Sequence, residues 1–190
     1  GLATATGLLS EGWKVAILDR DSDALVEAKA GLPGVVGVDA DVSIPEDVER
    51  AVAEVTEVFG RLDGLVNNAG VADFGPIQET TFERWQRVMR TNLDGPFLMT
   101  QAFTDLLAED GGGAVVNITS ISGLRASTLR VAYGTSKAAL AQLTLQQAAE
   151  LGELGIRVNA VAPGPVATKL AMAVHSPEII AAYHDALLLN

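Results

Sequence analysis

The chain has 190 residues, a net charge of −11 and no cysteine. The length is consistent with one domain over residues 1–190, and the acidity argues against nucleic acid as a partner, because phosphate binding needs a basic surface. The lack of cysteine excludes disulfides, thiolate catalysis and cysteine-based metal sites. Since His175 and His184 lack the spacing and further ligands of a metal centre, we expect no metal site. No apolar run is long enough to span a membrane, so we expect no membrane partner.

Predicted strands and helices alternate along the first third of the chain. Strands are predicted over residues 13–19, 35–39 and 62–67, and helices over 1–9, 24–30 and 46–59. Asp21 lies in an N-cap cluster before the second helix, and Ser43 with Glu46 forms a capping-box pattern around Pro45. Because each predicted strand is followed by a predicted helix, the pattern indicates βαβ units and a parallel sheet.

Polar residues follow the ends of these predicted strands. Asp19 ends the first strand, Asp41-Val42 follow the second, and Asn67-Asn68-Ala69-Gly70 ends the third. In open α/β sheets, ligands bind at the carboxyl ends of the strands. Each motif also has a simpler structural interpretation. Asp19 could be a turn residue, and Asp41 or Ser43 could cap the next helix. The stretch that ends in Gly70 could form an ordinary turn.

The second half of the chain continues the alternation. A helix with a cap-like start at Thr80–Glu83 leads through Asn92 into a long helix that reaches Asp110 and ends at three glycines. The apolar run 114–119 predicts a buried strand and places Ser120 at its carboxyl end. A further helix, a strand and an apolar helical stretch are predicted over residues 133–151, 156–161 and 169–190.

Tyr133 and Lys137 lie four positions apart, so they share one face of the predicted helix. A nearby ammonium favours the tyrosinate and lowers the pKa of the phenol. A tyrosine tuned in this way can transfer a proton at ordinary pH. Alone, the pair is a weak signal, since such pairs are ordinary neighbours on helices. It gains weight from the motifs arranged in order around it, which end with Pro163-Gly164.

Together, these motifs resemble the classical short-chain dehydrogenase/reductase family, over most of the chain. The resemblance implies an α/β fold with a Rossmann-like, doubly wound parallel sheet and helices on both faces. It implies that Tyr133 is the acid/base on the substrate oxygen, that Ser120 binds that oxygen, and that Lys137 lowers the pKa of the tyrosine and binds the nicotinamide ribose. Asn92 would anchor a water relay beside the lysine; a satisfied polar residue that kinks the helix is the alternative. Ser122 is the alternative to Ser120 as the serine that binds the substrate oxygen. Ser120, Ser122 and Tyr133 are the predicted substrate contacts.

The resemblance also implies a nicotinamide cofactor, and we expect NAD. Asp19 would bind the adenosine ribose hydroxyls and repel the 2′-phosphate of NADP, although the adjacent Arg20 could accommodate a phosphate. The further predicted cofactor contacts are Gly1, Asp41, Val42, Asn68, Ala69, Gly70, Tyr133, Lys137, Pro163, Gly164, Val166 and Thr168.

The implied function is an NAD-dependent oxidoreductase that transfers a hydride between the nicotinamide and a secondary alcohol or ketone. Alternatives are an NADPH-dependent ketoreductase of the 3-oxoacyl type, a lyase or epimerase that uses bound NAD, and a non-catalytic NAD-binding scaffold. In the family, the two long helices form a dimer contact, so we expect a homodimer or homotetramer, and a cytoplasmic location.

The family pattern extends beyond the two ends of this sequence. Gly1 matches the last of three glycines in the family's phosphate-binding turn, which follows a first strand. The family also has a last strand after the region that ends here at Asn190. We therefore expect the sequence to be truncated at both ends.

Overall fold

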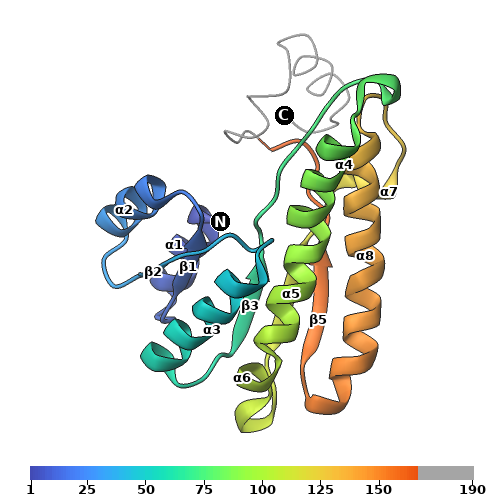
Figure 1. Cartoon of the computed structure of the whole chain (residues 1–190). Helices are drawn as coiled ribbons and strands as arrows, with labels where there is room; N and C mark the ends of the chain where they lie inside the picture. The colour runs from blue at the N-terminus through green and yellow to red at the C-terminus, as the bar shows by residue number, and fades with distance from the viewer. Residues whose placement is uncertain (167–190) are drawn as a thin grey trace, which may run out of the picture.

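The computed structural model describes residues 1–166 and shows an α/β architecture (Figure 1). Its strands form two parallel sheets, ordered β1-β2 and β3-β4-β5 within this range. The strands are β1 (Ala16–Asp19), β2 (Val36–Asp39), β3 (Gly64–Asn67), β4 (Ala114–Ile118) and β5 (Arg157–Val161). All pairings are parallel, as the alternation of strands and helices predicts.

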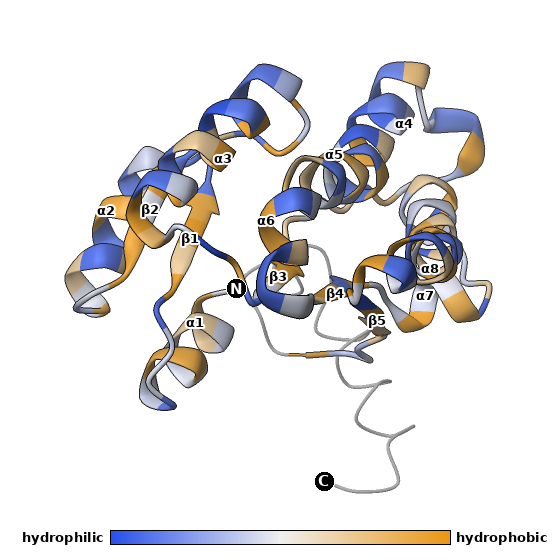
Figure 2. Cartoon of the chain, turned by 90° about the horizontal axis from the view of Figure 1, so that it is seen from below, coloured by the Kyte–Doolittle hydropathy of each residue, from blue (hydrophilic) through white to orange (hydrophobic). Residues whose placement is uncertain are grey.

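The helices are α1 (Leu2–Ser10), α2 (Ser22–Gly31), α3 (Pro45–Phe59), α4 (Phe82–Met89), α5 (Gly95–Ala102), α6 (Thr104–Ala108), α7 (Ile121–Leu124) and α8 (Val131–Leu151). Helices lie on both sides of β1 and β2, and α5 and α8 pack against β3, β4 and β5 (Figure 2). The strand β1 shows the two-sided packing, because Ala16 and Leu18 contact the larger hydrophobic cluster while Ile17 contacts a smaller cluster under α1. Strands buried on both faces are typical of parallel sheets, so the predicted fold class is confirmed.

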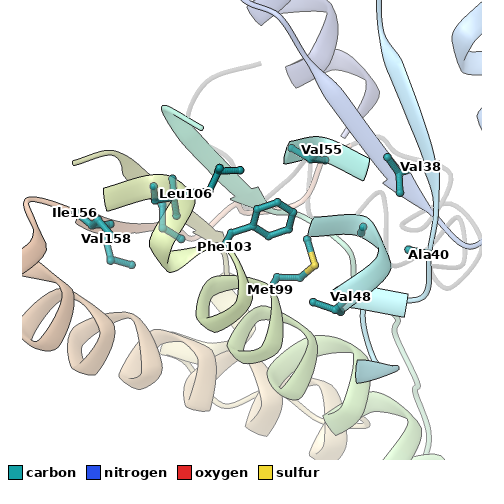
Figure 3. Close-up of a cluster of buried hydrophobic side chains, with 12 residues drawn as sticks. Val38, Ala40, Val48, Val55, Met99, Phe103, Leu106, Ile156 and Val158 are labelled. Atoms are coloured by element: carbon teal, nitrogen blue, oxygen red, sulfur yellow. The ribbon is translucent and has the colours of Figure 1, made fainter. Parts of the chain in front are cut away.

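The larger cluster links the two sheets (Figure 3). Phe103 and Met99, from the α5 region, lie between Val38 of β2 on one side and Val158 of β5 on the other (Figure 3). Phe103 is almost completely buried. Burial of each such side chain contributes about 1.5–3 kcal/mol, so this cluster is what holds the two sheets in one body.

Two local predictions were wrong. The long helix predicted from Pro96 to Asp110 is interrupted at Phe103, and a π-helical turn (Arg90–Asp94) separates α4 from α5. Pro96 has no N–H to bond the carbonyl of Asn92 four residues earlier, so a regular α-helical ladder cannot pass through this point. The capping box is also absent, because the N-cap of α3 is Ile44 and the Ser43 hydroxyl donates to Asp41 Oδ1 at 2.6 Å.

Other local predictions were confirmed. The carboxylate of Asp21 accepts the N–H of Ala24 at 3.0 Å, and the Thr81 hydroxyl accepts the N–H of Arg84 at 3.3 Å, so both cap their helices. The stretch predicted over 169–190 lies outside the described residues. Within residues 1–166, no helix combines the length and the apolar character that crossing a membrane requires.

Candidate active site

A cleft of about 2260 Å³ lies between the two sheets and runs past the carboxyl ends of the strands. Within the described part of the chain, β1 pairs only with β2 and β3 only with β4, and residues of both β1 and β3 line the cleft. Most of the predicted site residues line it as well: Gly1, Asp19, Asp41, Val42, Asn68, Ala69, Gly70, Ser120, Ser122, Tyr133, Lys137, Pro163, Gly164 and Val166. Asn92 lies behind the cleft wall, and Thr168 lies outside the described residues.

The helix α8 carries Tyr133 and Lys137 on one face, as their spacing predicts. The ammonium nitrogen of Lys137 lies 6.0 Å from the centroid of the Tyr133 ring and donates to the carbonyl of Ile118 at 2.7 Å. The lysine is only 4% exposed. Burial lowers the pKa of Lys137 to about 8, so the ammonium still predominates at neutral pH and is lost as the pH rises through that value.

The two candidate serines lie where β4 meets α7. Ser120 is the N-cap of α7, and its hydroxyl oxygen accepts the N–H of Ser122 at 3.1 Å. The hydroxyl oxygen of Ser122 accepts a hydrogen bond from Arg130 Nη1 at 2.9 Å. Both side chains are buried at the cleft wall. Because both oxygens act as acceptors in these contacts, each hydroxyl can still donate its proton to a substrate oxygen.

Asn92 sits in the π-helical turn and is completely buried. Its Nδ2 donates to the carbonyl of Val71 at 2.9 Å and to the hydroxyl of Ser136 at 3.0 Å, while its Oδ1 accepts the N–H of Val71 at 2.8 Å. The side chain therefore ties the turn to α8 and to the loop after β3. This agrees with the interpretation of Asn92 as a satisfied polar residue at a kink, although π-turns are also frequent at functional sites.

Gly70 lies where the groups around Lys137 come closest to the backbone. A Cβ atom at this position would lie 3.3 Å from Asn92 Oδ1 and 3.5 Å from Lys137 Nζ. The missing side chain thus leaves room for Asn92 and Lys137 to pack closely against the backbone after β3. The predicted role of this motif, close approach of a ligand, stays a prediction.

Asp41 organises a turn on the other side of the cleft. Its Oδ1 accepts the N–H and the hydroxyl of Ser43 at 2.9 and 2.6 Å, and its Oδ2 forms an ion pair with Arg20 Nη1 at 3.0 Å. Partial burial opposes the charge, but the bonds from Ser43 and Arg20 outweigh it and hold the pKa of Asp41 below its ordinary value. Asp19 is exposed nearby and accepts the N–H of Asp21 at 3.1 Å.

The sequence analysis missed a group of residues beside Tyr133. The ring of Phe74 contacts the Tyr133 ring edge to face, with centroids 5.9 Å apart. The guanidinium of Arg130 lies 4.9 Å from the centroid of Phe74. The carboxylate of Asp73 pairs with two arginines of α4, one of which is Arg84. An aromatic residue shortly after Gly70 was the only signal in the sequence, and nothing local connects it to a residue 59 positions away.

Comparisons with known proteins agree with this architecture. The chain matches the short chain dehydrogenase family model over residues 1–179. It is 39% identical over 170 residues to 2-(S)-hydroxypropyl-CoM dehydrogenase 3 of Xanthobacter autotrophicus, which covers 87% of this chain and 67% of that protein. The crystal structure of levodione reductase superposes with a TM-score of 0.90 at 33% identity, covering 100% of this chain and 78% of the other.

A third match is the crystal structure of an NAD⁺-bound xylitol dehydrogenase. It superposes with a TM-score of 0.84 at 34% identity, and the match covers 93% of this chain and 73% of the other. The family model, the sequence relative and both structures thus agree with the Rossmann-like architecture described above. The chain belongs to the short-chain dehydrogenase family of oxidoreductases.

Proposed function

We propose that this chain carries the site of an NAD-dependent oxidoreductase that interconverts a secondary alcohol and a ketone, with Tyr133 as the acid/base. The observation that carries the proposal is the buried ammonium of Lys137 beside the Tyr133 ring, at a cleft wall that also holds Ser120. Membership of the family supports a reaction at a CH–OH group.

Each side chain at this wall has one task in the proposed reaction. Ser120 donates its hydroxyl proton to the substrate oxygen and so fixes the substrate's orientation. The phenol of Tyr133 gives a proton to that oxygen during reduction and accepts it during oxidation. The Lys137 ammonium stabilises the tyrosinate that this transfer leaves behind. When bound, the nicotinamide supplies or accepts the hydride.

The lining of the cleft at the carboxyl ends of the strands fits a dinucleotide in its chemistry. Asp19 lines the cleft at the carboxyl end of β1, where a carboxylate can accept hydrogen bonds from the hydroxyls of a ribose. The same charge repels a 2′-phosphate, and the neighbouring Arg20 is paired with Asp41. These features support NAD, and the relative bound to NAD⁺ agrees with that choice.

Titration of the purified protein with NADH and, separately, with NADPH tests the cofactor, because bound reduced nicotinamide changes its fluorescence. Tight NADH and weak NADPH binding are expected. Turnover is then measured with NAD⁺ on a panel of secondary alcohols, and Tyr133→Phe should lower kcat by roughly 10²–10⁴-fold without weakening NADH binding. The matched control is Tyr183→Phe, since Tyr183 is the only other tyrosine.

The alternatives have distinct outcomes in the same assay. Preference for NADPH would indicate the 3-oxoacyl type of ketoreductase, and binding without turnover on any substrate would indicate a scaffold. A product formed with no added cofactor would indicate a lyase or epimerase. Activity of Tyr133→Phe within a few-fold of the parent would refute the acid/base assignment. The single domain over residues 1–190, the homodimer or homotetramer and the cytoplasmic location stay predictions.

A further inference from the structure

We propose that Phe74 is a positioning residue that holds the Tyr133 ring in its working orientation, and that Asp73 and two arginines of α4 hold Phe74 in turn. The inference rests on the proposed function, in which Tyr133 is the acid/base. The contacts that carry it run from the loop after β3 to α4 and to the start of α8.

The first contact is between the two rings. The Phe74 and Tyr133 centroids are 5.9 Å apart and the ring planes meet at 87°, which is the edge-to-face geometry that aromatic pairs favour. The helix α8 fixes the backbone of Tyr133 but leaves its side-chain torsions a choice of staggered rotamers. The ammonium of Lys137 lies 6.0 Å from the same ring. Phe74 therefore helps to select the orientation in which the ring stays near that ammonium.

The second contact locks the ring of Phe74 itself. The Arg130 guanidinium lies 4.9 Å from the Phe74 centroid, within cation–π range. Arg130 Nη1 also donates to the hydroxyl of Ser122 at 2.9 Å. Since Arg130 is the residue immediately before α8, the ring of Phe74 lies between the residue that begins this helix and Tyr133 one turn later. Arg130, Phe74 and Tyr133 thus contact one another in series at the cleft wall.

The third set of contacts fixes the backbone under Phe74. Arg84 Nη2 donates to the Phe74 carbonyl at 3.2 Å, and Arg84 Nε donates to Asp73 Oδ2 at 3.0 Å. Arg87 Nη2 binds the same carboxylate at 2.7 Å. The Asp73 side chain is only 6% exposed, and the hydrogen bond from Arg84 followed by that from Arg87 outweighs burial and holds the pKa of Asp73 below its ordinary value. A buried carboxylate with two cations is costly to disturb, so the loop stays in place.

The loop is also tied to the segment that enters α8. The N–H of Gly75 donates to the carbonyl of Leu129 at 3.0 Å. Leu129 has a φ of +62°, a left-handed conformation that non-glycine residues seldom adopt. A loop joined to both α4 and the start of α8 can transmit its position to Tyr133. Simple packing would need only an apolar side chain of the right volume, so aromatic and aliphatic replacements distinguish the two roles.

A variant that keeps an apolar side chain but not the aromatic ring tests this role. Phe74→Leu removes the contacts of the ring with Tyr133 and with Arg130. Because the orientation of the Tyr133 ring matters in the reacting complex, we expect Phe74→Leu to lower kcat by roughly 10- to 100-fold with little change in KM.

Conservative and matched variants complete the test. Phe74→Tyr keeps the ring, so kcat should return close to that of the parent protein. Phe82→Leu is the matched control, because Phe82 is 67% exposed at the start of α4. Asp73→Asn loosens the loop without touching either ring and should act in the same direction with a smaller effect; Asp63→Asn, an exposed ion-pair residue, is its control.

The outcomes separate this inference from the proposed function. An unchanged kcat in Phe74→Leu overturns the positioning role, as does a change in KM alone, which would indicate a substrate contact instead. Activity of Tyr133→Phe within a few-fold of the parent refutes the proposed function, whereas an inactive Tyr133→Phe beside a fully active Phe74→Leu overturns this inference alone. If Phe74→Leu does not fold, Asp73→Asn and Phe74→Tyr in the kinetic assay decide by the same criteria.

Discussion

The two sides of the cleft hold their polar groups in different ways. On the β3–β4–α8 side, buried amides bond one another across elements. Asn67 Nδ2 donates to Asn117 Oδ1 at 2.8 Å, and Asn117 Nδ2 donates to Thr144 Oγ1 at 2.9 Å and to Gln147 Oε1 at 3.0 Å. No buried side-chain nitrogen or oxygen among the described residues lacks a partner. Such a network stiffens the strands that lead to the candidate catalytic residues.

On the β1–β2 side, most of the polar groups are exposed, and the carboxylates of Asp19 and Asp41 bond mainly within their own turns. Asp19 accepts the N–H of Asp21, and Arg20, although paired with Asp41, stays exposed. An exposed ion pair contributes about 0.2–1 kcal/mol to the free energy of unfolding. The comparison teaches that the β3–β4–α8 side of the cleft is rigid before any ligand binds. On the β1–β2 side, residues that select a ligand can be changed with little loss of stability. Variants on the first side should therefore alter rate and stability, and variants on the second should alter affinity alone.

After Tyr133→Phe, the largest effect on the rigid side is expected from Ser120→Ala. Loss of a donor to the substrate oxygen should lower kcat by roughly 10²–10³-fold. Ser122→Ala is the comparison variant, since both serines are buried at the same wall and Ser122 is the alternative substrate contact. Removal of the α7 cap costs about 1 kcal/mol by itself, which a thermal unfolding curve separates from the kinetic effect. A larger loss in Ser122→Ala would move the substrate-binding role to Ser122.

The buried ammonium on the same side makes stability depend on pH. Burial lowers the pKa of Lys137 from 10.5 to about 8, a fall that corresponds to about 3 kcal/mol. Between these values the unfolded chain binds more protons than the folded one, so the free energy of unfolding rises with pH through this window. The cost of burying the charged ammonium is fully present below pH 8, and it is gone above the pKa of lysine in the unfolded chain. Urea unfolding of the parent and of Lys137→Met tests this.

The difference in the free energy of unfolding between the parent and Lys137→Met isolates the contribution of the lysine from that of other titrating groups. This difference should change by about 3 kcal/mol between pH 8 and the pKa of lysine in the unfolded chain. A constant difference across the window would show that the Lys137 side chain is not desolvated in solution. The same variant also removes the hydrogen bond to the Ile118 carbonyl, which an ammonium donates more strongly than a neutral amine, so the loss of this bond partly offsets the change.

Asn117→Ala tests the buried network itself. The variant leaves the amide of Asn67 and the groups of Thr144 and Gln147 with fewer partners, so we expect a loss of roughly 2 kcal/mol in the free energy of unfolding. Asn159→Ala is the matched control, because Asn159 lies on the neighbouring strand β5 with an exposed side chain. Equal effects of the two variants in urea unfolding would contradict the difference between the two sides.

Local sequence signals predicted much of this molecule. The strands, the caps at Asp21 and Thr81, and the helix that carries Tyr133 with Lys137 depend on neighbours within one or two turns. The predicted catalytic, cofactor and substrate residues within the described range line one cleft, with Asn92 as the exception. The ends of parallel strands meet at one edge of a sheet, so residues that follow successive strands are brought together. The roles of these residues stay predictions.

The features that escaped prediction depend on contacts between distant residues. The π-turn forms where Pro96 interrupts the helical ladder and where Asn92 binds the backbone of Val71, 21 positions away. Ser43 does not cap α3, because its hydroxyl donates a hydrogen bond to the carboxylate of Asp41 instead. The contact of Phe74 with Tyr133 joins residues in different elements. No periodicity in the sequence reports such pairs.

The smallest effect is expected on the exposed side, from Asp19→Asn. The amide can still bond a ribose hydroxyl but no longer repels a phosphate. We expect NADH to bind up to about tenfold more weakly and NADPH several-fold more tightly, a change of about 1.4 kcal/mol or less in each binding free energy. Fluorescence titration with each cofactor measures both effects, and Asp23→Asn, an exposed aspartate in the first turn of α2, is the control.

The thermal stability of Asp19→Asn carries the other half of this prediction. Because Asp19 is exposed and bonds only the N–H of Asp21 among the described contacts, the melting temperature should stay within a degree or two of the parent. A large fall in stability would show that this side is as rigid as the other. An unchanged ratio of NADH to NADPH affinity would instead place the cofactor choice elsewhere, and the ion pair between Arg20 and Asp41 would then be the next position to change.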